Sequence, residues 1–371
     1  MTRSFAKALL LFLTLFGCGP HLRAADLTLR LQDPPAAGTL IVLLFDAANA
    51  FGDLRDPAAR FETALDGRDV YRFEGVPSGE YALLAYLDEN ANGRIDRNFI
   101  GIPREPLGFS NGYRPKGPPS YARAAFFLAE DETREFTIGL ARPLGRLGRV
   151  GIGGACLLRG SPYRGSNRLV YRLIPAVTYT GERLQIYGPY VQCGLFGSDR
   201  ARMAATGRYR LGPYEEDDSP ALDGLGDRKD TLMAGLAVQL EPGGGLDLSV
   251  SYEHDVLGRV EGGRAQIAVD KTFQLGRVRL SPELALDWLS ADLAGHDYGV
   301  PPTAATPARP AWDVGAAVNT ETGLRAFVDI SRDWLLAAGV AVEWLDNNIT
   351  RSPIVEDDHV VKGFATLSYV L

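Results

Sequence analysis

A run of oxygen-bearing side chains between residues 88 and 96 is the stretch of this sequence best suited to chemistry. Asp88, Asn90, Asn92 and Asp96 are interleaved with other residues around Gly93. Oxygen ligands at alternate positions, followed by a glycine that permits a sharp bend, are what a calcium loop requires. These four side chains are therefore our candidate ligands for Ca²⁺.

The same loop has a second interpretation in which it binds no ion. Phe99 occupies the position where a helix–loop–helix calcium site carries a bidentate glutamate, and no helical pattern flanks the loop. An Asx-rich hairpin, whose side chains cap their own backbone, would use the same residues. The sequence favours the hairpin, with Ca²⁺ as the alternative, and it predicts no other metal or cofactor.

Carboxylates also recur at alternate positions in the C-terminal half, where they could attract cations into a polar interior. They are Asp247, Glu253, Asp255, Glu283, Asp287 and Glu343. Arg264 and Arg279 lie nearby in the pattern, which favours internally paired charges over a cation path. A second acidic run, Glu215–Asp218, fits a solvated loop better than a surface cation site.

The sequence does not predict an enzyme. His254, His296 and His359 are scattered without metal-ligand spacing, and no Ser-His-Asp arrangement or phosphate-binding loop stands out. The net charge of -7 argues against a nucleic-acid partner, which would require a basic surface. Cys156 and Cys193 could form a disulfide or remain free thiols, and the sequence leaves both options open.

The first 25 residues read as an export signal. Arg3 and Lys7 precede an apolar run at residues 8–16, and small residues follow it. This order is typical of a secretory signal peptide, predicted here to span residues 1–25. A lipobox-like segment ending in Cys18 is the alternative, in which that cysteine would be acylated. Export is predicted in either case.

Residues 26–142 predict a separate β domain. Short apolar runs are separated by turn residues and show no helical period, which indicates an antiparallel sandwich. One short helix is expected at residues 57–65. The predicted strands are 27–31, 40–45, 71–73, 81–87, 124–128 and 136–140.

Residues 145–371 alternate apolar and polar side chains more regularly. In residues 246–256 one face carries leucine, valine and tyrosine, and the other carries serine and acids. From Trp334 to Trp344, at a rise of about 3.3 Å per residue, the chain is long enough for a tilted membrane crossing. A tryptophan at each end has the spacing of an aromatic girdle. The pattern predicts a transmembrane β-barrel.

The alternating pattern of this half contains eleven candidate strands. A barrel with both ends in the periplasm needs an even number, so we expect about 10–12 strands with one segment merged, split or misread. Short turns alternate with long loops at 213–228, 291–315 and 347–358, as in bacterial outer-membrane barrels. The candidates are 147–157, 168–179, 183–195, 201–212, 229–240, 246–256, 262–272, 278–288, 318–330, 334–344 and 359–371.

Each half carries a series of short motifs in a fixed order. They are 77–81, 88–96, 101–105, 108–111 and 117–120 in the first half, and 160–167, 174–175, 223–228, 298–300 and 352–357 in the second. By these motifs, residues 26–140 resemble an uncharacterised family of small secreted bacterial domains, which implies a sandwich of the transthyretin, immunoglobulin or carboxypeptidase-regulatory type without assigned activity. The second half resembles the MipA/OmpV family, which implies an outer-membrane barrel and, from one member, a scaffolding role for peptidoglycan-synthesising and -cleaving enzymes.

The sequence therefore predicts a non-enzymatic protein of the outer membrane with its N-terminal domain in the periplasm. Its expected role is a scaffold or adaptor for envelope machinery, with outer-membrane lipid and peptidoglycan-synthesising or -cleaving enzymes as partners. A pore for small solutes is the alternative function. A lipase-like barrel enzyme is a third hypothesis and would need a serine and a histidine that converge near the outer rim.

Overall fold

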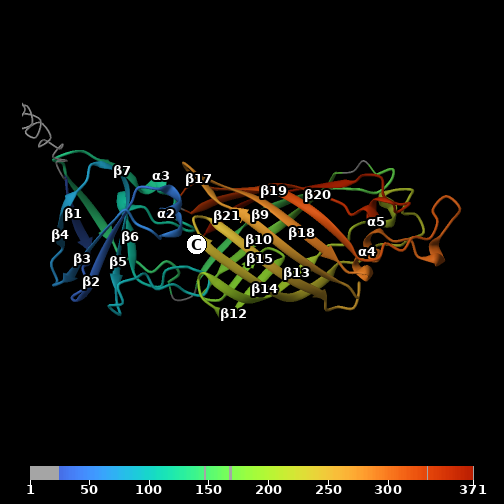
Figure 1. The fold of residues 1–371 in the computed structure, drawn as a ribbon, viewed down its shortest axis with the longest axis horizontal. Helices are drawn as coiled ribbons and strands as arrows, with labels where there is room; N and C mark the ends of the chain where they lie inside the picture. The colour runs from blue at the N-terminus through green and yellow to red at the C-terminus, as the bar shows by residue number, and fades with distance from the viewer. Residues whose placement is uncertain (1–24, 146–147, 167–168, 332, 371) are drawn as a thin grey trace, which may run out of the picture.

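The computed structural model of the 371-residue chain describes residues 25–145, 148–166, 169–331 and 333–370. An N-terminal pair of sheets, a barrel and a group of long loops follow one another along the long axis (Figure 1). The predicted signal peptide and the alternative acylation site Cys18 lie outside the described residues, apart from Ala25, which begins the first strand. Within the described chain, no helix combines the length and apolar character of a membrane span.

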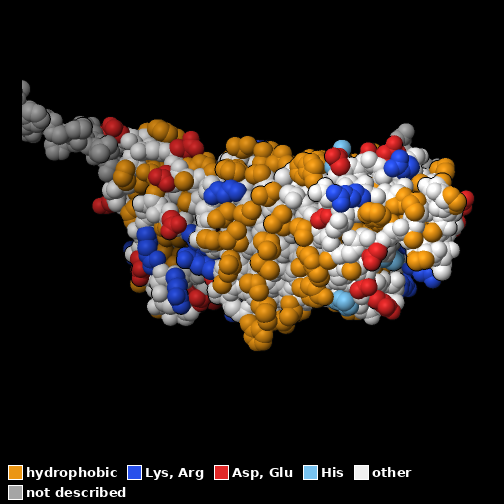
Figure 2. All heavy atoms as spheres, turned by 45° about the vertical axis from the view of Figure 1, so that its right-hand side comes forward, with side chains coloured by type: hydrophobic (Ala, Val, Ile, Leu, Met, Phe, Trp, Pro, Cys, Tyr) orange, Lys and Arg blue, Asp and Glu red, His pale blue; other side chains and the backbone are white. Residues whose placement is uncertain are grey.

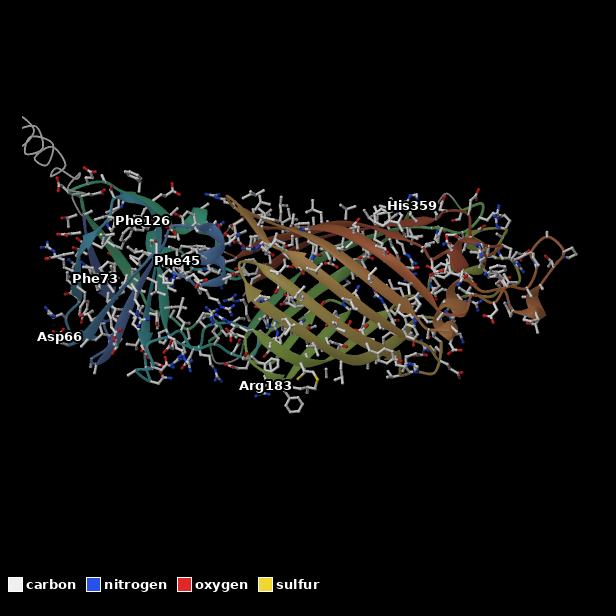
Figure 3. All side chains as sticks on the ribbon, in the orientation of Figure 1. Phe45, Asp66, Phe73, Phe126, Arg183 and His359 are labelled. Atoms are coloured by element: carbon white, nitrogen blue, oxygen red, sulfur yellow. The ribbon has the colours of Figure 1, made fainter. Side chains whose placement is uncertain are left out.

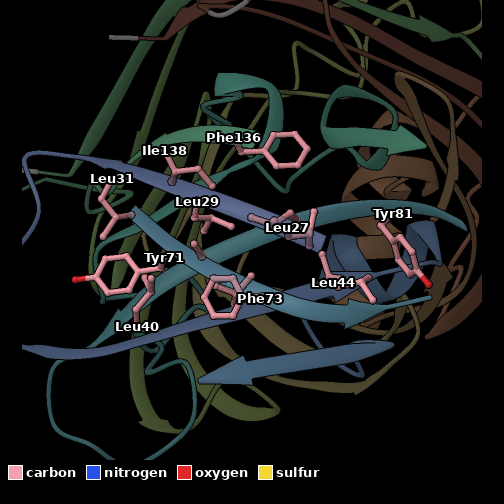
Figure 4. Close-up of a cluster of buried hydrophobic side chains, with 14 of the residues drawn as sticks. Leu27, Leu29, Leu31, Leu40, Leu44, Tyr71, Phe73, Tyr81, Phe136 and Ile138 are labelled. Carbon is pink, nitrogen blue, oxygen red and sulfur yellow. The ribbon is translucent and has the colours of Figure 1, made fainter. Parts of the chain in front are cut away.

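Two sheets form the N-terminal body, which we call the sandwich. One sheet has the order β4-β1-β8 and the other β3-β2-β5-β6, with β7 also paired to β5. Their inner faces meet in an apolar core that includes Leu29, Leu44 and Phe136 (Figure 4). The elements are β1 (Ala25–Gln32), β2 (Gly38–Phe45), α2 (Ala48–Asp53), β3 (Ala59–Leu65), β4 (Val70–Val76), β5 (Gly79–Asp88), β6 (Leu107–Phe109), η1 (Ser110–Gly112), α3 (Tyr121–Ala124), β7 (Ala125–Leu128) and β8 (Thr133–Gly139).

Two expectations for the sandwich are wrong. The expected helix at residues 57–65 is strand β3, in which Ala59, Phe61 and Leu65 pack inward at alternate positions against the core. The sheets are also not wholly antiparallel, because β1 and β8 pair in parallel. Only strands joined by a tight hairpin must be antiparallel, and the long chain between β1 and β8 permits the parallel arrangement.

Twelve strands, counted over the described residues, form a closed antiparallel barrel when β16 and β17 are taken as one interrupted strand along β18. The first and last strands of the barrel, β9 and β21, pair and close it. The strands are β9 (Arg149–Gly160), β10 (Leu169–Thr180), β11 (Leu184–Tyr187), β12 (Tyr190–Gly197), β13 (Ala201–Arg210), β14 (Thr231–Gly243), β15 (Leu246–Asp255), β16 (Gly263–Lys271), β17 (Phe273–Leu275), β18 (Val278–Leu289), β19 (Ala317–Asp329), β20 (Trp334–Trp344) and β21 (His359–Val370).

The structure explains why the sequence pattern contained an odd number of candidate strands. Residues 183–195, expected as one strand, are two strands, β11 and β12, joined at Gly188 and Pro189. Gly188 has a φ of 56°, a left-handed conformation that glycine adopts without steric cost. Tyrosines on both sides continue the aromatic pattern across the turn, and this concealed it in the sequence.

This short hairpin leaves part of β10 without a second neighbour. The carbonyl of Val177 accepts a hydrogen bond from the Gly188 amide at 3.0 Å, and in the described chain no strand pairs with that edge of β10 beyond it. Pro175 lies on the same free edge as Val177, because backbone groups alternate between the two edges of a strand. A proline offers no N–H there, which makes the edge a poor template for another strand.

The apolar face of the barrel points outward. Leu284, Leu286 and Trp288 are 49%, 48% and 39% exposed, whereas Asp287 between them is fully buried inside the barrel. Apolar side chains accordingly form a broad band over the barrel wall (Figure 2). Trp334 packs edge-on against Tyr369 at the sandwich end, and Trp288 and Trp344 stand at the ends of their strands near the long loops. A wide apolar band between aromatic girdles is the lipid-facing surface of an outer-membrane barrel.

The two ends of the barrel differ as the sequence predicts. Short turns, such as the one between β14 and β15, lie next to the sandwich, and the three predicted long loops lie at the far end (Figure 1). The long loops contain the short helices η2 (Glu216–Asp218), α4 (Ala291–Tyr298), η3 (Pro302–Ala304) and α5 (Asn347–Thr350). In bacterial outer-membrane barrels the short turns face the periplasm.

Candidate functional site

Paired charges line the inner wall of the barrel. Arg264 donates to Asp287 at 2.7 Å, and both residues come from neighbouring strands, β16 and β18. Two further groups have a cation between two acids: Arg325 lies 2.9 Å from both Asp270 and Glu283, and Lys362 lies 2.7 Å from both Glu321 and Glu343. Each network joins strands that are neighbours or next neighbours in the barrel wall.

Five of the six carboxylates singled out in the sequence have partners. Glu253 accepts from Arg208 at 3.0 Å, and Asp255 accepts backbone N–H groups of the turn that follows its own strand. With the pairs of Asp287, Glu283 and Glu343, this confirms the interpretation as internally paired charges. Asp247 is the exception, with no hydrogen bond or ion pair to another described residue. Arg279 pairs instead with Asp329 at 3.3 Å.

The long loops fold together over the far end of the barrel and form what we call the outer lid. Helix α4 is capped by Ser290, whose side chain accepts from the Leu293 amide, and it turns apolar side chains toward the other loops. The lid core consists of Tyr163, Tyr214, Leu222, Leu225, Val260, Leu289, Leu293, Ala294, Tyr298, Val300, Val314, Ala317, Leu345, Ile349, Ile354, Val355 and Val360. A shared hydrophobic core makes these loops one packed unit rather than separate solvated segments.

One ion pair joins this lid to the barrel wall. Asp297 of α4 contacts Arg210, at the end of β13, and its other oxygen lies 3.0 Å from Nδ1 of His296. The Asp297 side chain is 3% exposed. Burial by itself would raise the pKa of Asp297, but Arg210 and His296 hold this pKa below its ordinary value. The carboxylate therefore stays ionised and clamps the lid.

The acidic run Glu215–Asp218 belongs to the same lid and satisfies backbone groups there. Glu215 and Asp218 form a reciprocal cap around η2. The side chain of Glu216 accepts the Gly224 amide at 2.5 Å. The run is used for local loop structure, as the sequence favours.

At the opposite end, the sandwich is fixed to the barrel rim by contacts with several of the short turns. Gly245 N–H donates to Asp53 at 3.0 Å, Arg279 donates to the Pro118 carbonyl at 2.8 Å, and Arg123 donates to the Asp329 carbonyl at 2.6 Å. Further contacts are Arg55–Asp199, Gln274–Pro119, Tyr121–Gln274, Ser120–Gly276 and Asn98–Gly181. Contacts distributed around the rim fix the orientation of the sandwich. The sequence carries no signal for them, because each joins residues far apart in the chain.

Phe99 of the sandwich inserts against the rim at Gly194 of β12. A Cβ atom at Gly194 would lie 2.1 Å from the ring of Phe99, closer than any two such atoms can approach. The guanidinium of Arg183 also lies over the Phe99 ring, 5.5 Å from the ring centroid. The absence of a side chain at Gly194 thus makes room for the sandwich.

Gly194→Val is therefore expected to loosen the sandwich from the barrel. Overpacking of this kind typically costs about 1–3 kcal/mol, and the double variant Gly194→Val/Phe99→Ala should recover most of the loss. Hydrogen exchange of the backbone amides of residues 98–101 measures the docking. Gly207→Val is the matched control, because a side chain there meets open space. Equal exchange in Gly194→Val and the control would contradict this account.

The candidate calcium residues contact one another in the structure. Asp88 accepts the Gly93 amide at 2.7 Å, and the side-chain amides of Asn90 and Asn92 donate to Asp96 at 2.6 and 2.9 Å. Glu105 supports the loop by accepting the amides of Glu89 and Asp96, and burial raises the pKa of Glu105. These are the contacts of a self-capped Asx hairpin. They neither confirm nor refute the calcium interpretation, which stays a prediction.

Within the described part of the chain, the cysteines and histidines lie apart from one another. Cys156 and Cys193 are both free, with strands β10 and β11 between them. His254 stacks on Tyr252, and His296 contacts Asp297 in the lid. Among the residues that the structure describes, no histidine is hydrogen-bonded to a serine.

Residues 152–371 match the family model of the MltA-interacting protein MipA. The chain belongs to the MipA family. Residues 34–136 match a second model, an uncharacterized protein family conserved in bacteria, DUF2141. The sandwich and the barrel thus match two different family models, as the motifs of the sequence indicate.

Named relatives of this MipA-family chain are outer membrane proteins. It is 27% identical to the outer membrane protein Omp26La of Vibrio anguillarum over 156 residues, 42% of this chain and 60% of that protein. It is 26% identical to the outer membrane protein OmpV of Vibrio cholerae over the same shares. The matches thus span less than two thirds of these relatives. With the lipid-facing barrel, they place the chain in the outer membrane, with its sandwich on the periplasmic side.

The NanC porin is one of the solved structures similar to the chain. It is 11% identical to this chain, covers 60% of it with 99% of its own length, and has a TM-score of 0.30. A score of this size is too low for a structural argument about function.

Proposed function

We propose that this protein is a non-enzymatic outer-membrane scaffold, which holds its sandwich at a fixed orientation in the periplasm for a partner of the envelope machinery. The observation that carries the proposal is the set of contacts between the sandwich and the short turns around the barrel rim. A passive tether would need only the covalent connection. A fixed orientation is useful to a protein that presents a binding surface.

The sandwich offers such a surface on its edge strand β7. Phe127 is 62% exposed there, although its neighbours Phe126 and Leu128 are buried in the core. An exposed aromatic side chain on an edge strand is suited to contact with another protein. We propose an immunoglobulin- or transthyretin-like type for the sandwich and a peptidoglycan-synthesising or -cleaving enzyme as the partner. The description of the family as MltA-interacting supports this class of partner.

The packed outer lid and the ion-paired lumen favour a scaffold over a pore. A solute would have to pass the apolar lid core at one end, the paired charges of the lumen and the sandwich at the other end. A pore for small solutes is the competing function, and it would require the lid to open. Planar-bilayer conductance of the purified full-length protein separates the two, because a scaffold is expected to give no steady channel.

Photo-crosslinking in living cells tests the scaffold directly. A photoreactive residue replaces Phe127, and a second protein carries the same residue at Glu74, which is exposed on the other sheet. We expect a discrete crosslinked species from position 127 that contains a peptidoglycan enzyme, and none from position 74. Steady single-channel conductance together with no crosslink at either position would refute the scaffold and favour the pore.

A further inference from the structure

A cleft of about 710 Å³ lies where the sandwich meets the β10–β11 and β12–β13 turns of the barrel. Seven arginines line this junction cleft, against three carboxylates, in a chain whose net charge is -7. Basic side chains gather on the sandwich beside the barrel, and Arg183 marks the sandwich end of the barrel wall (Figures 2 and 3). The charged residues are Arg55, Arg60, Arg94, Arg97, Arg104, Arg183 and Arg200, with Asp96, Glu182 and Asp199.

The carboxylates of the cleft are already engaged with part of this positive charge. Asp199 lies 2.7 Å from Arg55 and 3.6 Å from Arg97, and Glu182 lies 3.2 Å from Arg104. Asp96 is occupied by the amides of the Asx hairpin. Positive charge in excess therefore remains in the cleft.

Two arginines on opposite walls carry much of that excess. Arg94 belongs to the sandwich loop and Arg200 to the β12–β13 turn, and both are exposed within the cleft. Neither guanidinium has a hydrogen-bond or ion-pair partner among the described residues. Burial lowers the pKa of the Arg97 guanidinium, and the nearby Arg55 lowers it further, while Asp199 acts against both. An anion between the walls would add negative charge beside these guanidinium groups.

The position of the cleft indicates which anion it receives. Phe196, two residues from Ser198 in the cleft wall, is 67% exposed on the lipid-facing side of the barrel. Trp334 and Tyr369 lie at the same periplasmic end of the barrel, where Trp334 is close to Arg123 of the sandwich. Aromatic side chains at a barrel end mark the level of lipid headgroups, so the cleft opens at the headgroups of the periplasmic leaflet.

We propose that the junction cleft binds a phosphate group, and that the phosphate is the headgroup of an anionic membrane lipid. Guanidinium groups bind phosphate oxygens through paired, charge-assisted hydrogen bonds, and Arg94 and Arg200 are free to form them. The lipid would then bridge the sandwich and the barrel. The cleft is separate from Phe127 and from the outer lid, so this site does not depend on the scaffold role.

Binding to the full-length protein in detergent tests the proposal. Native mass spectrometry measures retention of phosphatidylglycerol, with phosphatidylcholine and inorganic phosphate as separate arms. We expect Arg94→Gln/Arg200→Gln to weaken phosphatidylglycerol binding at least about tenfold, which corresponds to the loss of about 1.4 kcal/mol. The matched control is Arg68→Gln/Arg72→Gln, which removes the same charge from an exposed part of the sandwich. A heat-modifiability gel verifies that each variant is folded.

Arg94→Lys/Arg200→Lys keeps the charge but not the planar donors, and it should show an intermediate loss. If inorganic phosphate binds as tightly as the lipid and depends on the same arginines, the phosphate site stands and its source is a free phosphate. Equal retention of phosphatidylglycerol by the native protein, the glutamine variant and the control would overturn the proposal. Equal retention of phosphatidylcholine and phosphatidylglycerol by the native protein would do the same.

Discussion

Asp297→Ala is expected to release the outer lid and to destabilise the barrel by about 3–5 kcal/mol, the usual cost when one partner of a buried ion pair is removed. The substitution leaves Arg210, whose side chain is 20% exposed, without its carboxylate. The free energy of unfolding in urea, followed by tryptophan fluorescence in detergent, measures the loss. Released loops should also give flickering conductance in a planar bilayer.

A second acid on the same helix provides the control. Asp292 is exposed in the first turn of α4, so Asp292→Ala removes the same charge but is expected to cost at most about 1 kcal/mol. Asp297→Asn keeps the shape of the side chain and should still lose most of the stability, because the ionic partner of Arg210 is gone. If Asp297→Ala and Asp292→Ala unfold alike and both stay silent in the bilayer, the clamp plays no part in holding the lid.

The same clamp predicts a pH dependence. The pKa of Asp297 in the folded protein is lower than in the unfolded chain, because Arg210 and His296 favour the ionised form despite burial. Its contribution to stability is therefore complete above the unfolded aspartate pKa of about 3.9. It is lost as the pH falls through the lower pKa of the folded state. The unfolding free energies of native protein and Asp297→Asn, well separated at pH 7, should converge below about pH 4.

Much of the barrel could be predicted from the sequence because its strands obey a local rule. Side chains of a barrel strand alternate between the lipid and the lumen, which places Leu286 outside and Asp287 inside. This two-residue period can be recognised in one strand without knowing which strands pair with it. Strand β3 was wrongly predicted as a helix because Arg60, Glu62 and Ala64 on its outer face interrupt the apolar pattern. The β11–β12 turn was missed because tyrosines flank it on both sides.

The contacts between distant segments could not be predicted. Phe99 and Gly194 are unremarkable residues until the fold places one against the other. The lid core collects apolar residues from several loops that each look polar on average. Likewise, the arginines of the junction cleft come from four separate chain segments, so the basic site is hidden in an acidic sequence. The local pattern of side chains predicts individual strands. The rim contact, the lid core and the junction cleft depend instead on packing between segments that are distant in the chain.

The ion pairs of the lumen allow a test that distinguishes the scaffold function from the pore function. Asp287→Ala should destabilise the barrel by about 3–5 kcal/mol, because it leaves Arg264 in the interior without a carboxylate. Replacing both partners by apolar residues of similar size, Arg264→Met/Asp287→Leu, should be neutral or stabilising by about 1–4 kcal/mol. Urea unfolding in detergent measures both. Removing the exposed pair Arg68–Asp66 is the control and should leave the unfolding midpoint unchanged.

The double variant also separates structure from transport. If the lumen is a packed support for the sandwich, Arg264→Met/Asp287→Leu should retain the Phe127 crosslink and remain silent in the bilayer. If the lumen is a path for solutes, charges on its wall govern permeation, and exchanging a buried pair for apolar groups should change conductance or selectivity. A stable, crosslinking double variant with altered conductance would show that the paired charges serve a pore, because a purely structural pair has no means of changing an ion current.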